Sequence, residues 1–71
     1  MPDNTGETIR RTLLILRTIS VFQGKWFKLT DLAAKTGLAP STTHRYLTVL
    51  VEEGVLEQEE MFSRYRAKPR S

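Results

Sequence analysis

The sequence contains no cysteine and only one histidine among its 71 residues. Without cysteine, the chain cannot form a disulfide scaffold, a thiolate metal site or a cysteine nucleophile. One histidine leaves no metal cluster of the usual kind, and no Ser-His-Asp set or glycine-rich phosphate loop is visible. The sequence therefore predicts no catalytic residues, no metal site and no cofactor, so we do not expect an enzyme.

Long hydrophobic runs are also missing. The longest is LLIL at residues 13–16, far too short to span a bilayer, and the polar start MPDNTGETIRRT does not resemble a signal peptide. The length suits one small domain, near the lower limit for a single self-sufficient core. We expect a cytoplasmic protein with no membrane partner. Its folded domain should cover residues 6–67, between a flexible start at 1–5 and a flexible basic tail at 68–71.

Acidic and basic residues are nearly balanced over the whole chain, but near its end they gather in two separate segments. The net charge of +3 is a weak indication of a polyanionic partner. Residues 52–60 hold five glutamates, which are typical of a solvated face. Residues 61–71 hold no acid and four basic residues, for which a solvated tail and contact with a polyanion are both open: Arg64, Arg66, Lys68 and Arg70.

Residues from about 6 to 22 have the pattern of a first helix. Asn4 and Glu7 have the spacing of a capping box, although Asn replaces the usual Ser or Thr. At 100° per residue, one stripe carries the expected core contacts, with Ile19 at its edge: Ile9, Leu13, Leu16 and Ser20. Four more apolar residues lie off this stripe and form a candidate dimer interface: Leu14, Ile15, Val21 and Phe22. The alternative is that these four pack beneath Trp26, Phe27 and the C-terminal hairpin.

A short second helix is predicted over about residues 31–36, after a brief strand or extended link at 25–29. Thr30 is the candidate N-cap. Gly37 stands where a helix commonly ends in a left-handed residue, a conformation that glycine adopts without steric cost. The residues expected to be buried are Leu32 and Ala33.

A third helix is predicted from Pro40 or Ser41 to about Glu53, because proline favours the first helical position and serine favours the N-cap. Its inner face should carry Thr43, Leu47, Leu50 and Gly54, flanked by Tyr46 and Val51. Its outer face should carry Ser41, Arg45, Thr48 and Glu52, with Thr42 and Val49 beside them. Since a helix as short as the second is marginal alone, we expect it to brace the third in a helix-turn-helix.

Residues 55–59 and 62–67 each fit a short strand, and a turn around Glu60-Met61 would join them in a hairpin. The predicted fold is therefore mainly α with a small β-hairpin. It is a winged helix-turn-helix with a three-helix core, a short strand and a C-terminal two-stranded wing.

The third helix is the candidate for entry into a DNA major groove. Arg45 can bind a guanine edge bidentately or clamp a phosphate, and the sequence leaves both roles open. His44 is equally open between DNA contact and partial burial, while Trp26 and Phe27 are expected to cap the core rather than stack on bases. The candidate DNA-binding residues are Ser41, Thr42, His44, Arg45 and Thr48 on the helix, with Arg64 and Arg66 on the DNA backbone.

The stretch LTDLAAKTGLAPSTTHRYLTVLVEEGVL at residues 29–56, followed by YRA at 65–67, resembles the N-terminal winged helix-turn-helix domain of the IclR family of bacterial transcriptional regulators. Family members typically show a leucine-threonine opening, a G-L turn, S-T-x-H-R at the start of the recognition helix and G-[FVY]-[LV] before the wing. This sequence has them at residues 29–30, 37–38, 41–45 and 54–56. The resemblance implies a double-stranded DNA partner and a homodimer paired through the first helix.

Two features depart from that family. IclR-type regulators normally carry a much larger C-terminal effector-binding domain, which is not in this sequence, so no small-molecule effector is expected. Glu59 and Glu60 stand in the wing where a basic or neutral tip would suit phosphates. Three identities remain open: a small bacterial, phage or plasmid regulator, an isolated DNA-binding fragment of a larger effector-responsive regulator, or a winged-helix protein-protein adaptor that does not bind DNA.

Overall fold

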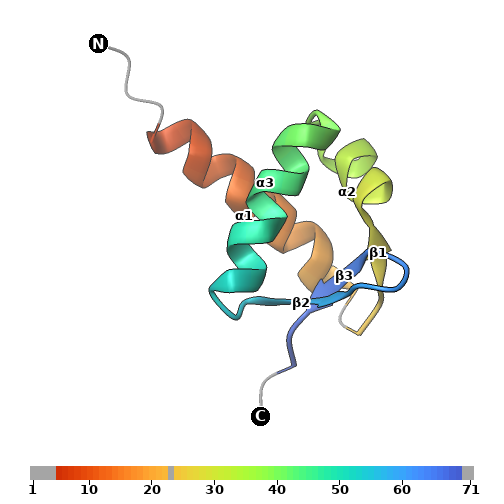
Figure 1. The fold of residues 1–71 in the computed structure, drawn as a ribbon. Helices are drawn as coiled ribbons and strands as arrows, with labels where there is room; N and C mark the ends of the chain where they lie inside the picture. Colours follow the sequence, from red (N-terminus) through yellow and green to blue (C-terminus); the bar gives the residue numbers. More distant parts are fainter. Residues whose placement is uncertain (1–4, 23, 70–71) are drawn as a thin grey trace.

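Three helices stand above a small three-stranded sheet in the computed structural model, which describes residues 5–22 and 24–69 (Figure 1). The helices are α1 (Thr5–Val21), α2 (Leu29–Thr36) and α3 (Pro40–Glu52). The strands are β1 (Phe27–Lys28), β2 (Leu56–Glu59) and β3 (Arg64–Ala67). This arrangement confirms the predicted winged helix-turn-helix, with β2, β3 and the turn between them as the wing. Among the described residues, none of the helices has the length and apolar character needed to cross a bilayer.

The core side of α1 differs from the predicted stripe. Ile15 and Ile19 are completely buried, whereas Ile9 and Leu13 are exposed and Leu16 is half-buried. The buried side is thus turned by about 100°, or one residue, from the expected one. Apolar residues occur on several sides of the helix around LLIL, so periodicity alone does not select a face. Packing of α1 against α2 and β3 selects it. The proposed capping residue Asn4 lies outside the described residues.

The start of α2 also corrects a prediction. The N-cap position is occupied by Lys28, which is extended at φ −80° and ψ 154° and makes no side-chain capping bond. Thr30 is therefore wrong as the N-cap and lies inside the first turn. The reason is that β1 runs directly into the helix, so its last residue already has the extended backbone that an N-cap requires.

The turn between α2 and α3 forms as expected. Gly37 is left-handed at φ 74°, and its N–H donates to the carbonyl of Ala33 at 2.9 Å. Pro40 is the first helical residue of α3 and Ala39 is the N-cap, which decides between the two predicted starts. The predicted burial of Leu32 and Ala33 is confirmed.

Every helix and every strand contributes to one core. Thr43 is its buried polar residue, and its hydroxyl donates to the carbonyl of Ala39 at 3.0 Å, so the hydroxyl is not left unpaired. Burial also raises the pKa of the Tyr65 hydroxyl above its ordinary value. The buried core consists of Ile15, Ile19, Phe27, Leu32, Leu47, Leu50, Leu56 and Tyr65.

The sheet has the order β1-β3-β2, with both pairings antiparallel. The β2–β3 hairpin was predicted, but the addition of β1 to β3 was not. In this register Phe27 pairs with Tyr65, and Glu57 and Glu59 pair with Arg66 and Arg64. Because side chains alternate along a strand, Phe27 and Tyr65 point into the core while the charged residues lie on the outer face.

Candidate nucleic-acid interface

The outer face of α3 carries the five predicted DNA-binding residues of this helix. Buried residues at positions 43, 47 and 50 fix the inner face, and the helical period then directs the opposite residues into solvent. Four of the five are exposed and Thr42 is half-buried. The exposure of His44 rules out the alternative that it is partly buried. The exposed four are Ser41, His44, Arg45 and Thr48.

The first turn of α3 has backbone donors with no side-chain cap. The N-cap Ala39 has no side chain that could accept from them, and the turn contains no acidic residue. Pro40 has no N–H, and the N–H groups of Ser41 and Thr42 have no partner within a helix. Together with the positive end of the helix dipole, they make the start of α3 favourable for an anion such as a phosphate.

The side chains along this face differ in what they can still bind. The Thr48 hydroxyl donates to the carbonyl of His44 at 2.9 Å, so toward a ligand it acts as an acceptor. Arg45 makes no side-chain hydrogen bond or ion pair anywhere in residues 5–22 and 24–69. All its guanidinium donors therefore remain available to a partner.

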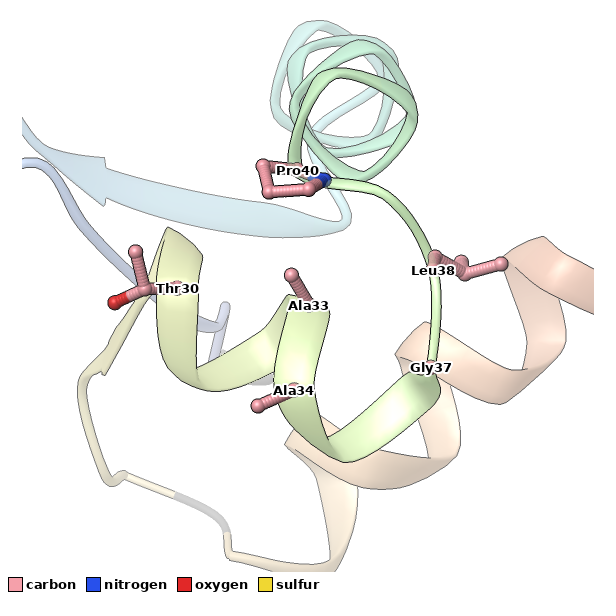
Figure 2. Close-up of a pocket in the computed structure, with 6 residues that line it drawn as sticks. All are labelled: Thr30, Ala33, Ala34, Gly37, Leu38 and Pro40. Carbon is pink, nitrogen blue, oxygen red and sulfur yellow. The ribbon is translucent and has the colours of Figure 1, made fainter.

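A groove separates α2 from the start of α3. It is lined by Thr30, Ala33, Ala34, Gly37, Leu38 and Pro40. Figure 2 shows the Ala33 methyl group directed from α2 toward the start of α3, where a larger side chain would push the two helices apart. Only Thr30 among the lining residues has a polar side chain, and none is titratable. The groove therefore marks where α2 packs against the start of α3, and it has no residues for acid-base chemistry.

The two wing arginines are engaged by glutamates on the neighbouring strand. The Arg66 Nε donates to Glu57 Oε2 at 2.6 Å. The Arg64 Nε donates to Glu59 Oε2 at 2.9 Å, and its terminal amino group contacts the same oxygen. We call these two contacts the wing pairs. They neutralise the positive charge of β3, which the sequence alone predicted to be a basic strand.

Aromatic rings lie against the same two arginines. The Arg66 guanidinium carbon is 4.5 Å from the centroid of the Trp26 ring. That of Arg64 is 4.9 Å from the Phe62 centroid and 5.9 Å from that of Trp26. These distances suit cation-π attraction. Trp26 is thus half-buried beneath the arginines, and only Phe27 lies within the core.

Lys28 and Glu57 were not identified as parts of this surface from the sequence, and Glu59 was placed in the wing but not paired with Arg64. The pairing of β1 with β3 sets Lys28 opposite Arg64, which adds an exposed cation to the outer face of the sheet. The glutamates had a recognisable signal. Two acids alternate along one strand and two bases along the other, with the spacing that brings opposite charges together in an antiparallel hairpin.

The exposed side of α1 corrects part of the candidate dimer interface. Ile15 is completely buried in the core, because the α1 side that meets α2 and β3 passes through it, so it cannot face a second chain. Leu14, Val21 and Phe22 are exposed, and Ile9 and Leu13 join them. A hollow on this side is lined by Arg10, Leu13, Leu14 and Arg17.

Residues 8–60 match the IclR helix-turn-helix domain family, a span that covers more than half of the chain and includes all of α2, α3 and β2. No curated protein matches the chain. The matching family consists of DNA-binding regulatory domains and is not an enzyme family. The helix-turn-helix geometry and the family match agree, and the chain belongs to the IclR helix-turn-helix family of DNA-binding transcription regulators.

Proposed function

We propose that the protein binds double-stranded DNA sequence-specifically as a small transcriptional regulator in the cytoplasm, with α3 in the major groove. Arg45 is the observation that carries the proposal. It is exposed on the helix that a helix-turn-helix presents to DNA, and no group in the described part of the chain occupies its donors. Ser41 and Thr42 would bind a phosphate or base at the start of the helix. His44 and Thr48 would lie further along the groove.

Arg64 and Arg66 are proposed to contact the DNA backbone only by exchanging a carboxylate for a phosphate. Both anions accept charge-assisted hydrogen bonds from a guanidinium. Since each arginine is paired, the wing should contribute less to affinity than its sequence suggests.

Fluorescence anisotropy with duplex DNA, repeated over a series of salt concentrations, tests this function. A domain of this size contacts few phosphates, and the affinity should fall as salt rises because bound counterions are released. Selection from a random-sequence pool should enrich one site. Absence of duplex binding at low salt, or binding insensitive to salt, would contradict the proposal.

We further propose a homodimer paired through α1. Leu14, Val21 and Phe22 leave apolar surface on this helix, and a single winged helix reads too few base pairs to locate one site in a genome. Two copies would favour inverted half-sites about one helical turn apart. Sedimentation equilibrium with and without a palindromic duplex tests this. A monomer in both conditions, or a dimer unaffected by Leu14→Glu, would remove the interface.

A protein-protein adaptor is the second candidate, and the tip of the wing favours it. Met61 and Phe62 are 82% and 58% exposed, beside a strand whose positive charge is neutralised. Exposed apolar residues of this kind are found at protein interfaces. An adaptor would show no salt-sensitive binding to arbitrary duplex DNA, so the anisotropy experiment separates the two functions.

A further inference from the structure

Both arginines of the wing are held in place before any ligand arrives. Each wing pair joins residues directly opposite one another in the β2–β3 register, so the backbone itself brings the charges together. The four side chains are about one-third exposed, between 28% and 35%. They are therefore within reach of a ligand, yet their charge is already compensated.

A phosphate must compete with these glutamates. A guanidinium offers the same donors to a carboxylate and to a phosphate, so a wing arginine that binds DNA must first release its partner. The released carboxylate then stays beside the polyanion, where like charges repel. Both effects reduce what the wing gains from any DNA, whatever its sequence.

The size of the suppressed contribution follows from counterion release. Each phosphate neutralised on duplex DNA changes the logarithm of affinity by about 0.9 per tenfold change in salt. Relative to about 1 M salt, where this electrostatic gain vanishes, one freed arginine should therefore raise the affinity up to about eightfold at 0.1 M salt. This gain carries no sequence information, because it comes from the phosphates.

We propose that Glu57 and Glu59 limit the sequence-independent affinity of the wing for DNA. They hold the wing arginines off the phosphates of arbitrary DNA, so that affinity depends mainly on the contacts of α3. This inference rests on the proposed function. The rings of Trp26 and Phe62 hold the guanidinium groups independently of the carboxylates, so an arginine without its glutamate remains positioned to bind a phosphate.

The test compares two double variants of the full chain with the same change in net charge. E57Q/E59Q removes the carboxylates of both wing pairs. E53Q/E60Q is the matched control, because Glu53 and Glu60 are exposed and form no ion pair within residues 5–22 and 24–69. Partly exposed ion pairs contribute little to stability, so both variants should fold, which circular dichroism and thermal unfolding will check.

Binding is measured by anisotropy with a random-sequence duplex over a salt series. Relative to the control, E57Q/E59Q should bind up to about eightfold more tightly for each freed arginine at 0.1 M salt, with a salt slope steeper by about 0.9 per arginine. Its preference for a selected site over random DNA should stay the same, because both duplexes offer the same phosphates. Adding R64Q/R66Q should abolish this gain, while the same pair of changes in the wild type should have a smaller effect.

Equal affinities and equal salt slopes for E57Q/E59Q and E53Q/E60Q would overturn the inference and leave the proposed function intact. The same applies if R64Q/R66Q weakens random-duplex binding equally in both backgrounds. Failure of the wild type and of both variants to bind any duplex at low salt would instead overturn the proposed function.

Discussion

The outer face of α3 and the outer face of the wing both present arginines, but in opposite states. Arg45 has no acid among the residues three and four positions away on its helix, and it stays unpaired within the described chain. Arg66 lies directly across from Glu57 and is paired. The comparison shows that a count of basic residues overstates the charge available to DNA, because local geometry decides which cations are free.

The largest expected effect comes from Ile15→Ala. This substitution should destabilise the core that supports both the α3 face and the wing. Ile15 is completely buried where α1 meets the rest of the core, and removing its side chain leaves a cavity. We expect a loss of about 2–5 kcal/mol in the free energy of unfolding, measured by urea denaturation. Leu14→Ala, at a residue that is 41% exposed, is the control and should cost much less in dilute monomer. Equal losses would mean that the buried side of α1 is wrongly assigned.

Arg45→Ala should show most clearly that DNA binding depends on the outer face of α3 rather than on the wing. If Arg45 reads a base, the variant should lose about 1–3 kcal/mol at a selected site and little on random DNA. Anisotropy with both duplexes measures this. Lys25→Ala, which removes the same charge from the turn before β1, should weaken both targets similarly. An equal loss on both targets for Arg45→Ala would make Arg45 a phosphate clamp.

A smaller effect is expected for the contact between Trp26 and Arg66. A double-mutant cycle with Trp26→Ala and Arg66→Met should give a coupling of about 0.5–1 kcal/mol in unfolding free energy, as for an exposed cation-π pair. The same cycle with Arg45→Met should give none, because Arg45 lies against no aromatic ring in the described part of the chain. Coupling of equal size in both cycles would contradict a specific contact between Trp26 and Arg66.

The smallest effect concerns Tyr65 in β3. Its side chain is buried on the core side of the sheet, and its hydroxyl is uncharged at neutral pH. Burial raises the pKa of Tyr65 in the folded chain above its ordinary value of 10.0. The unfolded chain therefore loses this proton first as pH rises. The contribution of Tyr65 to stability should be constant below pH 10 and should be lost as pH rises from there through the folded pKa. Urea denaturation at several alkaline pH values should show this decline, and Tyr65→Phe should reduce it. A decline of the same size in both proteins would assign it to other groups.

The local patterns predicted the helix-turn-helix well, because its signals are short-range. Gly37 requires no tertiary information to mark the end of α2, and the spacing of Thr43, Leu47 and Leu50 defines the inner face of α3 by the helical period alone. The outer residues of α3 follow from that inner face. The candidate site on this helix could therefore be predicted from the sequence.

Predictions that required long-range pairing were less successful. The two residues of β1 are too few to show alternation, so its addition to β3 and the position of Lys28 were not foreseen. The face of α1 was wrong because Leu13, Leu14 and Ile15 are all apolar and any of them could have faced the core.

The sequence by itself determined the order of the elements, the turn at Gly37 and the outward face of α3, since each depends on residues within a few positions of one another. Only the tertiary structure decided which side of α1 is buried and which arginines are free. The reason is physical: burial depends on what packs against a helix, and the charge state of a surface depends on which strands lie next to each other. Arg64 and Arg66 look free in the sequence, and the β2–β3 register pairs them.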